Sequence, residues 1–145
     1  MNQSHSTDQA TAFRTISDCV REHALRDPHR LALCDETLHI DYATLDAWMD
    51  RVASALQRDG LRPGEAVGIC AGASVLYAAA FLGALRAGAA IAPIAPSVTR
   101  DQFGAMLRDA QARICLIDRM ALELLPQGSE GPQVVLSLFG TELAA

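Results

Sequence analysis

Four residues in the first quarter of the chain carry side chains that commonly bind zinc. They are Cys19, His23, His29 and Cys34, in the pattern C-x3-H-x5-H-x4-C. Structural zinc sites usually take ligands in closely spaced pairs. Here the residues fall on a predicted helix, a proline turn and a predicted strand, and the spacing matches no common zinc site. A structural role for these side chains is favoured over metal binding.

The cysteines are also candidates for a catalytic nucleophile, which needs a lowered thiol pKa and a partner base. Cys34, Cys70 and Cys115 fall in short apolar runs that predict buried strands. A cysteine buried in this way behaves as a small hydrophobic residue. We therefore expect no catalytic thiol.

The segment after residue 70 is the other place where chemistry could occur. Ser74 lies between a predicted strand and a predicted helix, but the local sequence AGASVLY lacks the G-x-S-x-G pattern of a nucleophilic serine. Helix capping is its expected role. Gly72 could approach a phosphate at the start of the helix, yet a dinucleotide site would need G-x-G-x-x-G. A small nucleotide-binding protein is thus a disfavoured alternative.

One predicted helix carries Asp41, Asp46 and Asp50 at intervals of four to five residues. Such a charge pattern is typical of a solvated helix face. Trp48 lies at helical spacing with Leu45 and is predicted to belong to the core rather than to a stacking platform.

The charge composition excludes several functions. All 12 basic residues are arginine, so the chain has no lysine. This excludes a phosphate loop of the Walker type and Schiff-base chemistry within the chain. The net charge is −5, and no stretch gathers arginine on one face. Binding of nucleic acid is therefore not expected.

Nothing in the sequence indicates a membrane segment or a secretory signal. The longest apolar stretch, residues 75–95, is interrupted by Arg86 and by glycine and proline. Residues 1–12 are polar and are predicted to form a flexible tail. We expect a cytoplasmic protein, in which disulfides would be unusual.

The elements that would position these residues follow from apolar periodicity and capping signals. Helices are predicted over residues 15–26, 42–58, 75–86, from residue 99 onwards, and over 120–125. A small hairpin is predicted from residues 31–34 and 38–40, and buried strands from residues 66–70, 91–94, 113–118 and 134–139. Residues 126–132 have the composition of a linker.

Strands and helices alternate after residue 60, and this order predicts a partial doubly wound α/β fold. Its sheet would be mostly parallel, with helices on both faces and the hairpin at the amino-terminal side. The whole of residues 13–145 is predicted to form one incomplete domain.

Three stretches carry a resemblance that goes beyond composition. They are IDYATL (residues 40–45), LRPGEAVGI (61–69) and LRAGAAIAPIAP (85–96), and FGAMLRDAQARICLID (103–118) extends the similarity. In this order they resemble the amino-terminal part of the adenylate-forming superfamily, which includes acyl-CoA and aryl-CoA synthetases, adenylation domains of peptide synthetases, and luciferases. The resemblance covers about residues 15–138.

The resemblance implies an enzyme that activates a small carboxylic acid with ATP and Mg²⁺ and then transfers the acyl group to a thiol such as that of CoA. The family's phosphate loop and catalytic lysine follow the matched motifs, so no catalytic, cofactor-binding or metal-binding residue is assigned within this chain. The expected partner is the remainder of the enzyme. The chain alone is expected to be inactive, and to self-associate through exposed apolar surface.

The segment APIAPSVTRDQF (residues 92–103) resembles acyl- and aryl-CoA ligases more than peptide synthetases. A CoA ligase is therefore the favoured interpretation. A peptide-synthetase adenylation domain and a non-catalytic interaction module with the same fold are the alternatives.

Overall fold

The computed structural model describes residues 13–126 and 132–137. The predicted tail, residues 1–12, lies outside this range, as does most of the predicted linker. The described helices are α1 (Ile16–Arg26), α2 (Tyr42–Arg58), α3 (Val75–Arg86), α4 (Arg100–Asp109) and the 3-10 helix η1 (Met120–Leu124). The described strands are β1 (Leu31–Cys34), β2 (His39–Asp41), β3 (Ala66–Cys70), β4 (Ala90–Pro93), β5 (Ile114–Ile117) and β6 (Val134–Ser137).

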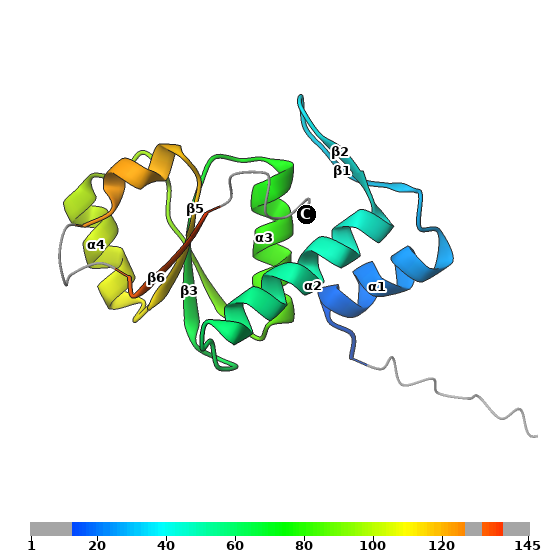
Figure 1. Ribbon diagram of the computed structural model, residues 1–145, viewed down its shortest axis with the longest axis horizontal. Helices are drawn as coiled ribbons and strands as arrows, with labels where there is room; N and C mark the ends of the chain where they lie inside the picture. Colours follow the sequence, from blue (N-terminus) through cyan, green and yellow to red (C-terminus); the bar gives the residue numbers. More distant parts are fainter. Residues whose placement is uncertain (1–12, 127–131, 138–145) are drawn as a thin grey trace, which may run out of the picture.

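A parallel sheet separates two layers of helices, as the sequence predicts (Figure 1). Its strands lie in the order β4-β3-β5-β6, and every neighbouring pair is parallel. The chain leaves β3 towards β4, one edge of the described sheet, and then returns past β3 to form β5. The hairpin β1–β2 is a separate antiparallel pair.

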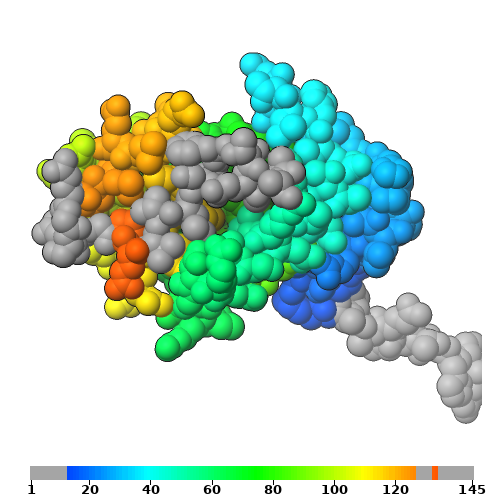
Figure 2. Space-filling model, viewed as in Figure 1, coloured from blue at the N-terminus to red at the C-terminus, as the bar shows by residue number. Residues whose placement is uncertain are grey.

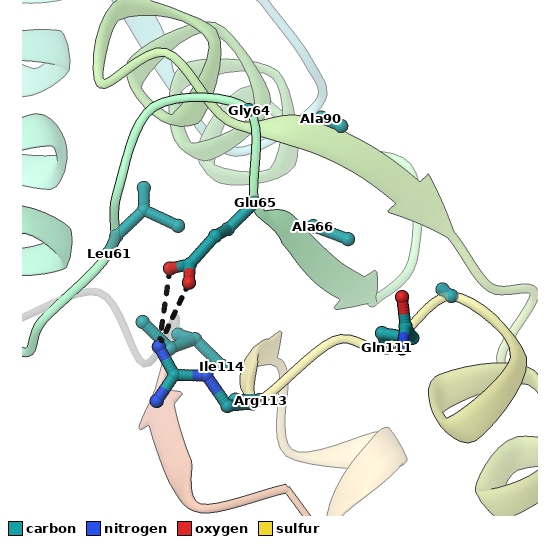
Figure 3. Close-up of a pocket in the computed structure, with 9 residues that line it drawn as sticks. Leu61, Gly64, Glu65, Ala66, Ala90, Gln111, Arg113 and Ile114 are labelled. Atoms are coloured by element: carbon teal, nitrogen blue, oxygen red, sulfur yellow. Dashed lines mark hydrogen bonds and ion pairs between the residues drawn. The ribbon is translucent and has the colours of Figure 1, made fainter.

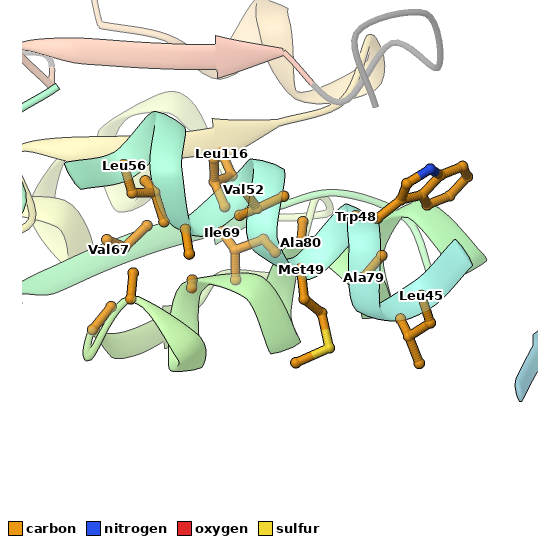
Figure 4. Close-up of a cluster of buried hydrophobic side chains, with 14 of the residues drawn as sticks. Leu45, Trp48, Met49, Val52, Leu56, Val67, Ile69, Ala79, Ala80 and Leu116 are labelled. Carbon is orange, nitrogen blue, oxygen red and sulfur yellow. The ribbon is translucent and has the colours of Figure 1, made fainter. Parts of the chain in front are cut away.

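The helices α2 and α3 cover one face of the sheet. Their apolar sides meet alternate residues of the strands, among them Val67 and Ile69 of β3 and Leu116 of β5 (Figure 4). The two helices approach closely because α3 carries Gly83 at the crossing. A Cβ atom placed there would lie 2.5 Å from the Cβ atom of Val52. Trp48 of α2 is buried, as predicted.

The opposite face of the sheet is covered by α4 and η1. The alternate residues Cys70 and Cys115 face this side and pack with Phe103 of α4. Gly68 of β3 allows α4 to lie close to the sheet, since a Cβ atom on it would be 2.5 Å from Leu107 Cδ2. The two faces of one strand thus belong to two separate cores.

The predicted helix starts are confirmed at the level of hydrogen bonds. Thr15 and Thr99 each form a capping box, with Asp18 and Gln102 respectively. Asp41 accepts from the backbone N–H of Thr44 at the start of α2. These contacts satisfy N–H groups that the first turn of a helix leaves without partners.

Some sequence expectations are wrong in detail. Cys34, expected in a buried strand, is exposed, because the hairpin stands apart from the main sheet. The segment after residue 119 is a 3-10 helix rather than an α-helix. Strand β4 begins at Ala90 and ends at Pro93, one residue earlier at each end than the predicted range of 91–94. Strand β6 is described to Ser137, so the rest of the predicted last strand lies outside the described residues.

No described helix is long and apolar enough to span a bilayer.

Candidate functional site

The carboxyl edge of the sheet between β3 and β5 is the place where an α/β protein most often binds a ligand. The connections diverge there, since helix α3, which follows β3, and helix η1, which follows β5, lie on opposite faces of the sheet. In this chain the loop after β3 contains Gly72 and Ser74, and the residue after β5 is Asp118. These residues form the first candidate site.

Asp118 bridges the two loops at this edge. Its Oδ2 atom accepts from the backbone N–H of Gly72 at 2.8 Å, and its Oδ1 atom accepts from the backbone N–H of Ala121 at 3.0 Å. The backbone N–H of Asp118 in turn donates to the carbonyl of Cys70 at 3.3 Å. The carboxylate therefore occupies the position beside Gly72 that an anionic ligand would need.

The start of α3 is also occupied by the protein's own side chains. Ser74 Oγ accepts from the backbone N–H of Tyr77 at 3.1 Å, which confirms the predicted capping role. Asp35, from the loop of the β1–β2 hairpin, accepts from the backbone N–H of Val75 at 2.8 Å. Helix N-termini attract anions, and here Asp35 is that anion.

Asp35 is held by further hydrogen bonds from its own loop. The backbone N–H groups of Thr37 and Leu38, and the Thr37 hydroxyl, all donate to its Oδ1 atom. The hydrogen bond from Val75, followed by those from Thr37, places the pKa of Asp35 well below the usual aspartate value. The carboxylate is thus fixed in its charged form.

The loop after β3 consequently does not fit a phosphate group. The N–H groups of Gly72, Val75 and Tyr77 already donate to Asp118, Asp35 and Ser74. These three N–H groups are therefore not available to a phosphate, and no chemical step is assigned to this loop.

The candidate zinc ligands do not come together. His23 stacks on Tyr42 with ring centroids 4.8 Å apart, and His29 Nδ1 lies 3.3 Å from Asp41 Oδ2. Cys34 lies exposed in the hairpin. Within the described part of the chain, no group of three His, Cys, Asp or Glu residues is placed to hold a metal ion.

The buried cysteines have the protonated thiols expected of core residues. Desolvation raises the pKa of Cys70 to about 11 and that of Cys115 to about 12. Thiolates are the reactive form, so neither side chain is prepared for nucleophilic attack at neutral pH.

The acidic face of α2 is not simply solvated, which corrects the interpretation from sequence. Asp46 and Asp50 accept hydrogen bonds from Arg21 of α1 and from Arg86 of α3. The Arg86 guanidinium also donates to Ser17 Oγ at 2.6 Å and to the Asp46 carbonyl at 2.8 Å. This cluster joins three helices. No sequence pattern indicates it, because the partners lie far apart along the chain.

A cavity of about 560 Å³ opens at the amino edge of the sheet (Figure 3). It is lined largely by small and aliphatic residues, including Ala66, Ala90 and Ile114. Glu65 and Arg113 lie side by side in its wall, with Glu65 Oε2 3.2 Å from Arg113 Nη2. Because these charges neutralise each other, the pair gives the cavity no net charge that would select a charged ligand.

Comparison with known proteins identifies the family. The family model described as AMP-binding enzyme matches residues 20–143. Tyrocidine synthase 3 from Brevibacillus parabrevis is 32% identical over 124 residues, which cover 86% of this chain and 2% of that protein. Polyketide synthase PksN from Bacillus subtilis is 36% identical over 103 residues, 71% of this chain and 2% of its own length. The chain thus spans only a small part of these curated relatives.

Solved structures share the fold. The N-terminal domain of FACL13 from Mycobacterium tuberculosis superposes with a TM-score of 0.81 at 19% identity, covering 92% of this chain and 36% of that one. The nonribosomal peptide synthetase FmoA3, in its α-methyl-L-serine-AMP bound form, has a TM-score of 0.76 at 27% identity, covering 84% of this chain and 14% of that one. The chain belongs to the AMP-binding enzyme family, and its fold is that of the amino-terminal lobe of adenylate-forming enzymes.

Proposed function

We propose that the chain is the supporting amino-terminal part of an enzyme that activates a carboxylic acid. Such an enzyme joins the carboxylate to the AMP part of ATP and releases pyrophosphate. A thiol then takes the acyl group and releases AMP. The observation that carries the proposal is the family match over residues 20–143, which coincides with the parallel sheet and its flanking helices.

The acceptor that we favour is CoA, and the support comes from residues 92–103. This segment, APIAPSVTRDQF, forms the end of β4, the following loop and the start of α4, and it resembles the acyl- and aryl-CoA ligases of the family. The substrate would be a small carboxylic acid, and the enzyme would work in the cytoplasm with ATP, Mg²⁺ and CoA.

A second candidate is the adenylation domain of a peptide synthetase. Several similar curated proteins carry names of this kind, including a dimodular nonribosomal peptide synthase from Bacillus subtilis that is 26% identical over 132 residues. The two candidates share the adenylation step and differ in the carboxylate and in the thiol that receives it.

The role of this chain in either reaction would be to hold the fold rather than to perform chemistry. Its carboxylates at the sheet edge, Asp35 and Asp118, are engaged by backbone N–H groups, and it has no lysine. Adenylation needs cationic groups directed at the reacting phosphate. These would come from the remainder of the enzyme, which is the proposed partner.

The test is ATP–pyrophosphate exchange with the purified chain and with a chimera. The chimera carries residues 20–143 in place of the matching segment of FmoA3, and is assayed with α-methyl-L-serine. We expect no exchange by the chain alone and measurable exchange by the chimera. The control is the same chimera with Gly83→Leu, which should lose exchange because α2 and α3 can no longer pack.

Two outcomes would contradict the proposal. A folded chimera without exchange would show that the chain is not a functional substitute for an adenylating scaffold, and would favour a non-catalytic interaction module. Robust exchange by the chain alone would show that it carries reactive groups of its own.

A further inference from the structure

Helix α1 forms a layer of its own, outside α2 and α3 and on the side away from the sheet (Figure 1; blue in Figure 2). Of the residues of α1, only Val20 is buried. Ile16 and Leu25 keep 58% and 81% of their surface exposed. The helix therefore adds a single aliphatic side chain to the core.

Hydrogen bonds from charged side chains and the stacking of His23 on Tyr42 provide further attachment. Arg86 of α3 donates from Nε to Ser17 Oγ at 2.6 Å and from Nη2 to Asp46 Oδ1 at 2.6 Å. Its side chain is only 10% exposed. Arg21 of α1 donates to Asp50 Oδ2 at 2.7 Å. Arg86 thus lies at the centre of the contact between α1 and the rest of the molecule.

The helix itself is stabilised by contacts that do not involve the body of the protein. Thr15 and Asp18 form a complete capping box at its start. Glu22 pairs with Arg14 and, four residues along, with Arg26. These local contacts would persist if α1 moved away from α2 and α3.

Packing is incomplete where α1 begins. A cavity of about 550 Å³ lies between residues 13–18 and the end of α3, with Leu85 and Arg86 in its wall. Part of the surface that movement of α1 would uncover is thus already open to solvent.

We infer that α1 is a strap that opens and closes on α2 and α3 as one unit, with Arg86 as its latch, while the sheet stays folded. Regions with little apolar burial open at lower free energy than the core. Opening exposes Val20 and breaks the hydrogen bonds of Arg86 with Ser17 and of Arg21 with the carboxylates of α2. The sheet meanwhile keeps both of its apolar faces covered. This movement of α1 does not depend on which carboxylic acid the enzyme would take as its substrate.

Hydrogen–deuterium exchange of the 145-residue chain, read by mass spectrometry, tests this inference. The amides of α1 should exchange faster than those of β3 and β5 in the wild-type chain. Arg86→Gln should raise α1 exchange by roughly tenfold or more, because charged hydrogen bonds are lost, and should leave β3 and β5 unchanged. The matched control is Arg113→Gln, which breaks the Glu65 ion pair at the amino edge of the sheet and should leave α1 unchanged.

Asp50→Asn is a milder variant for the case in which Arg86→Gln does not fold. Its side chain is 54% exposed, so the chain should tolerate it, with a smaller increase in exchange confined to α1. Equal exchange in α1 and the strands of the wild-type chain would overturn the strap. An equal increase across α1, β3 and β5 in the variants would do so as well, because it would mean that α1 opens only when the whole chain unfolds.

Discussion

Gly83 of α3 lies directly against Val52 of α2, so that an added Cβ atom would be 2.5 Å from the Val52 Cβ atom and 3.1 Å from the Met49 carbonyl oxygen. Neither atom is the end of a flexible side chain. The two helices must separate to accept any larger residue at this position.

Gly83→Ala should destabilise the chain although alanine is the better helix former. The overpacking against Val52 should cost about 1–3 kcal/mol, more than the gain of about 1 kcal/mol in helix propensity. Urea unfolding followed by the fluorescence of Trp48 measures the difference. Gly72→Ala is the control, since its Cβ atom would be 3.7 Å from Asp118 Oδ2, an ordinary contact. Equal stability of the two variants would contradict the close packing of α2 and α3.

Gly68→Ala and Leu107→Ala should not be additive. The Cβ atom at residue 68 would meet Leu107 Cδ2 at 2.5 Å, and truncation of Leu107 removes that atom. Leu107→Ala alone should cost about 2–5 kcal/mol because Leu107 is buried. The double variant should be more stable than the sum of the two losses predicts. Strict additivity in urea unfolding would mean that α4 does not contact the sheet at Gly68.

Asp35→Asn should lower the thermal stability at neutral pH and should reduce the loss of thermal stability at acidic pH. The pKa of Asp35 is lowered in the folded chain, chiefly by the hydrogen bond from Val75. The unfolded chain therefore binds a proton at a higher pH than the folded chain does. The contribution of Asp35 is present above the unfolded pKa of about 3.9 and is lost as the pH falls towards the lower folded pKa.

Melting temperatures at pH 7 and pH 3 provide the measurement. The difference between the two should be smaller in Asp35→Asn than in the wild-type chain. Glu36→Gln removes the next carboxylate of the same loop, which accepts none of the hydrogen bonds described above, and should retain the wild-type difference. If both variants behave alike, Asp35 does not fix the hairpin to α3.

Alkylation should separate the cysteines by their position in the fold. Cys34 is exposed and should react with iodoacetamide in the native chain, whereas Cys70 and Cys115 are buried, with pKa values raised to about 11 and about 12. They should react only after unfolding. Mass spectrometry of tryptic peptides locates the label. Fast labelling of Cys115 in the folded chain would contradict the described core.

Self-association of the isolated chain stays a prediction. Met106, Met120 and Leu122 are 42%, 72% and 41% exposed on the neighbouring helices α4 and η1, and exposed apolar groups favour association. Sedimentation velocity should show oligomers that dissociate on dilution, and Met120→Glu should shift the distribution towards the monomer. A clean monomer at all concentrations of the wild-type chain would refute it.

The main helices and the parallel sheet could be predicted from sequence because their signals are local. Residues 42–58 carry a long apolar stripe, and Thr15, Ser74 and Thr99 mark helix starts that the hydrogen bonds confirm. The exposure of Cys34 could not be predicted, since a four-residue apolar run does not reveal whether its strand joins the main sheet.

The contacts of the side chains at the candidate site cannot be predicted from the sequence. Asp35 lies 40 residues before Val75, and Asp118 lies 46 residues after Gly72, so their capping of the loop after β3 depends on the folded arrangement. The same holds for Arg86, whose contacts with Ser17 span 69 residues. Sequence spacing cannot indicate such pairings, because the relative position of the helices decides them.

The position of Pro93 at the end of β4, the edge strand of the described sheet, limits growth of the sheet. Ala90 and Ile94 donate their N–H groups to Glu65 and Ile69 on the β3 side, so residues 91 and 93 direct their backbone groups outward. Proline has no N–H to offer, and the outer rim of β4 is left with the single donor of Ile91. A foreign strand could form only a short, interrupted ladder there, which protects the chain from stacking into fibres along this rim.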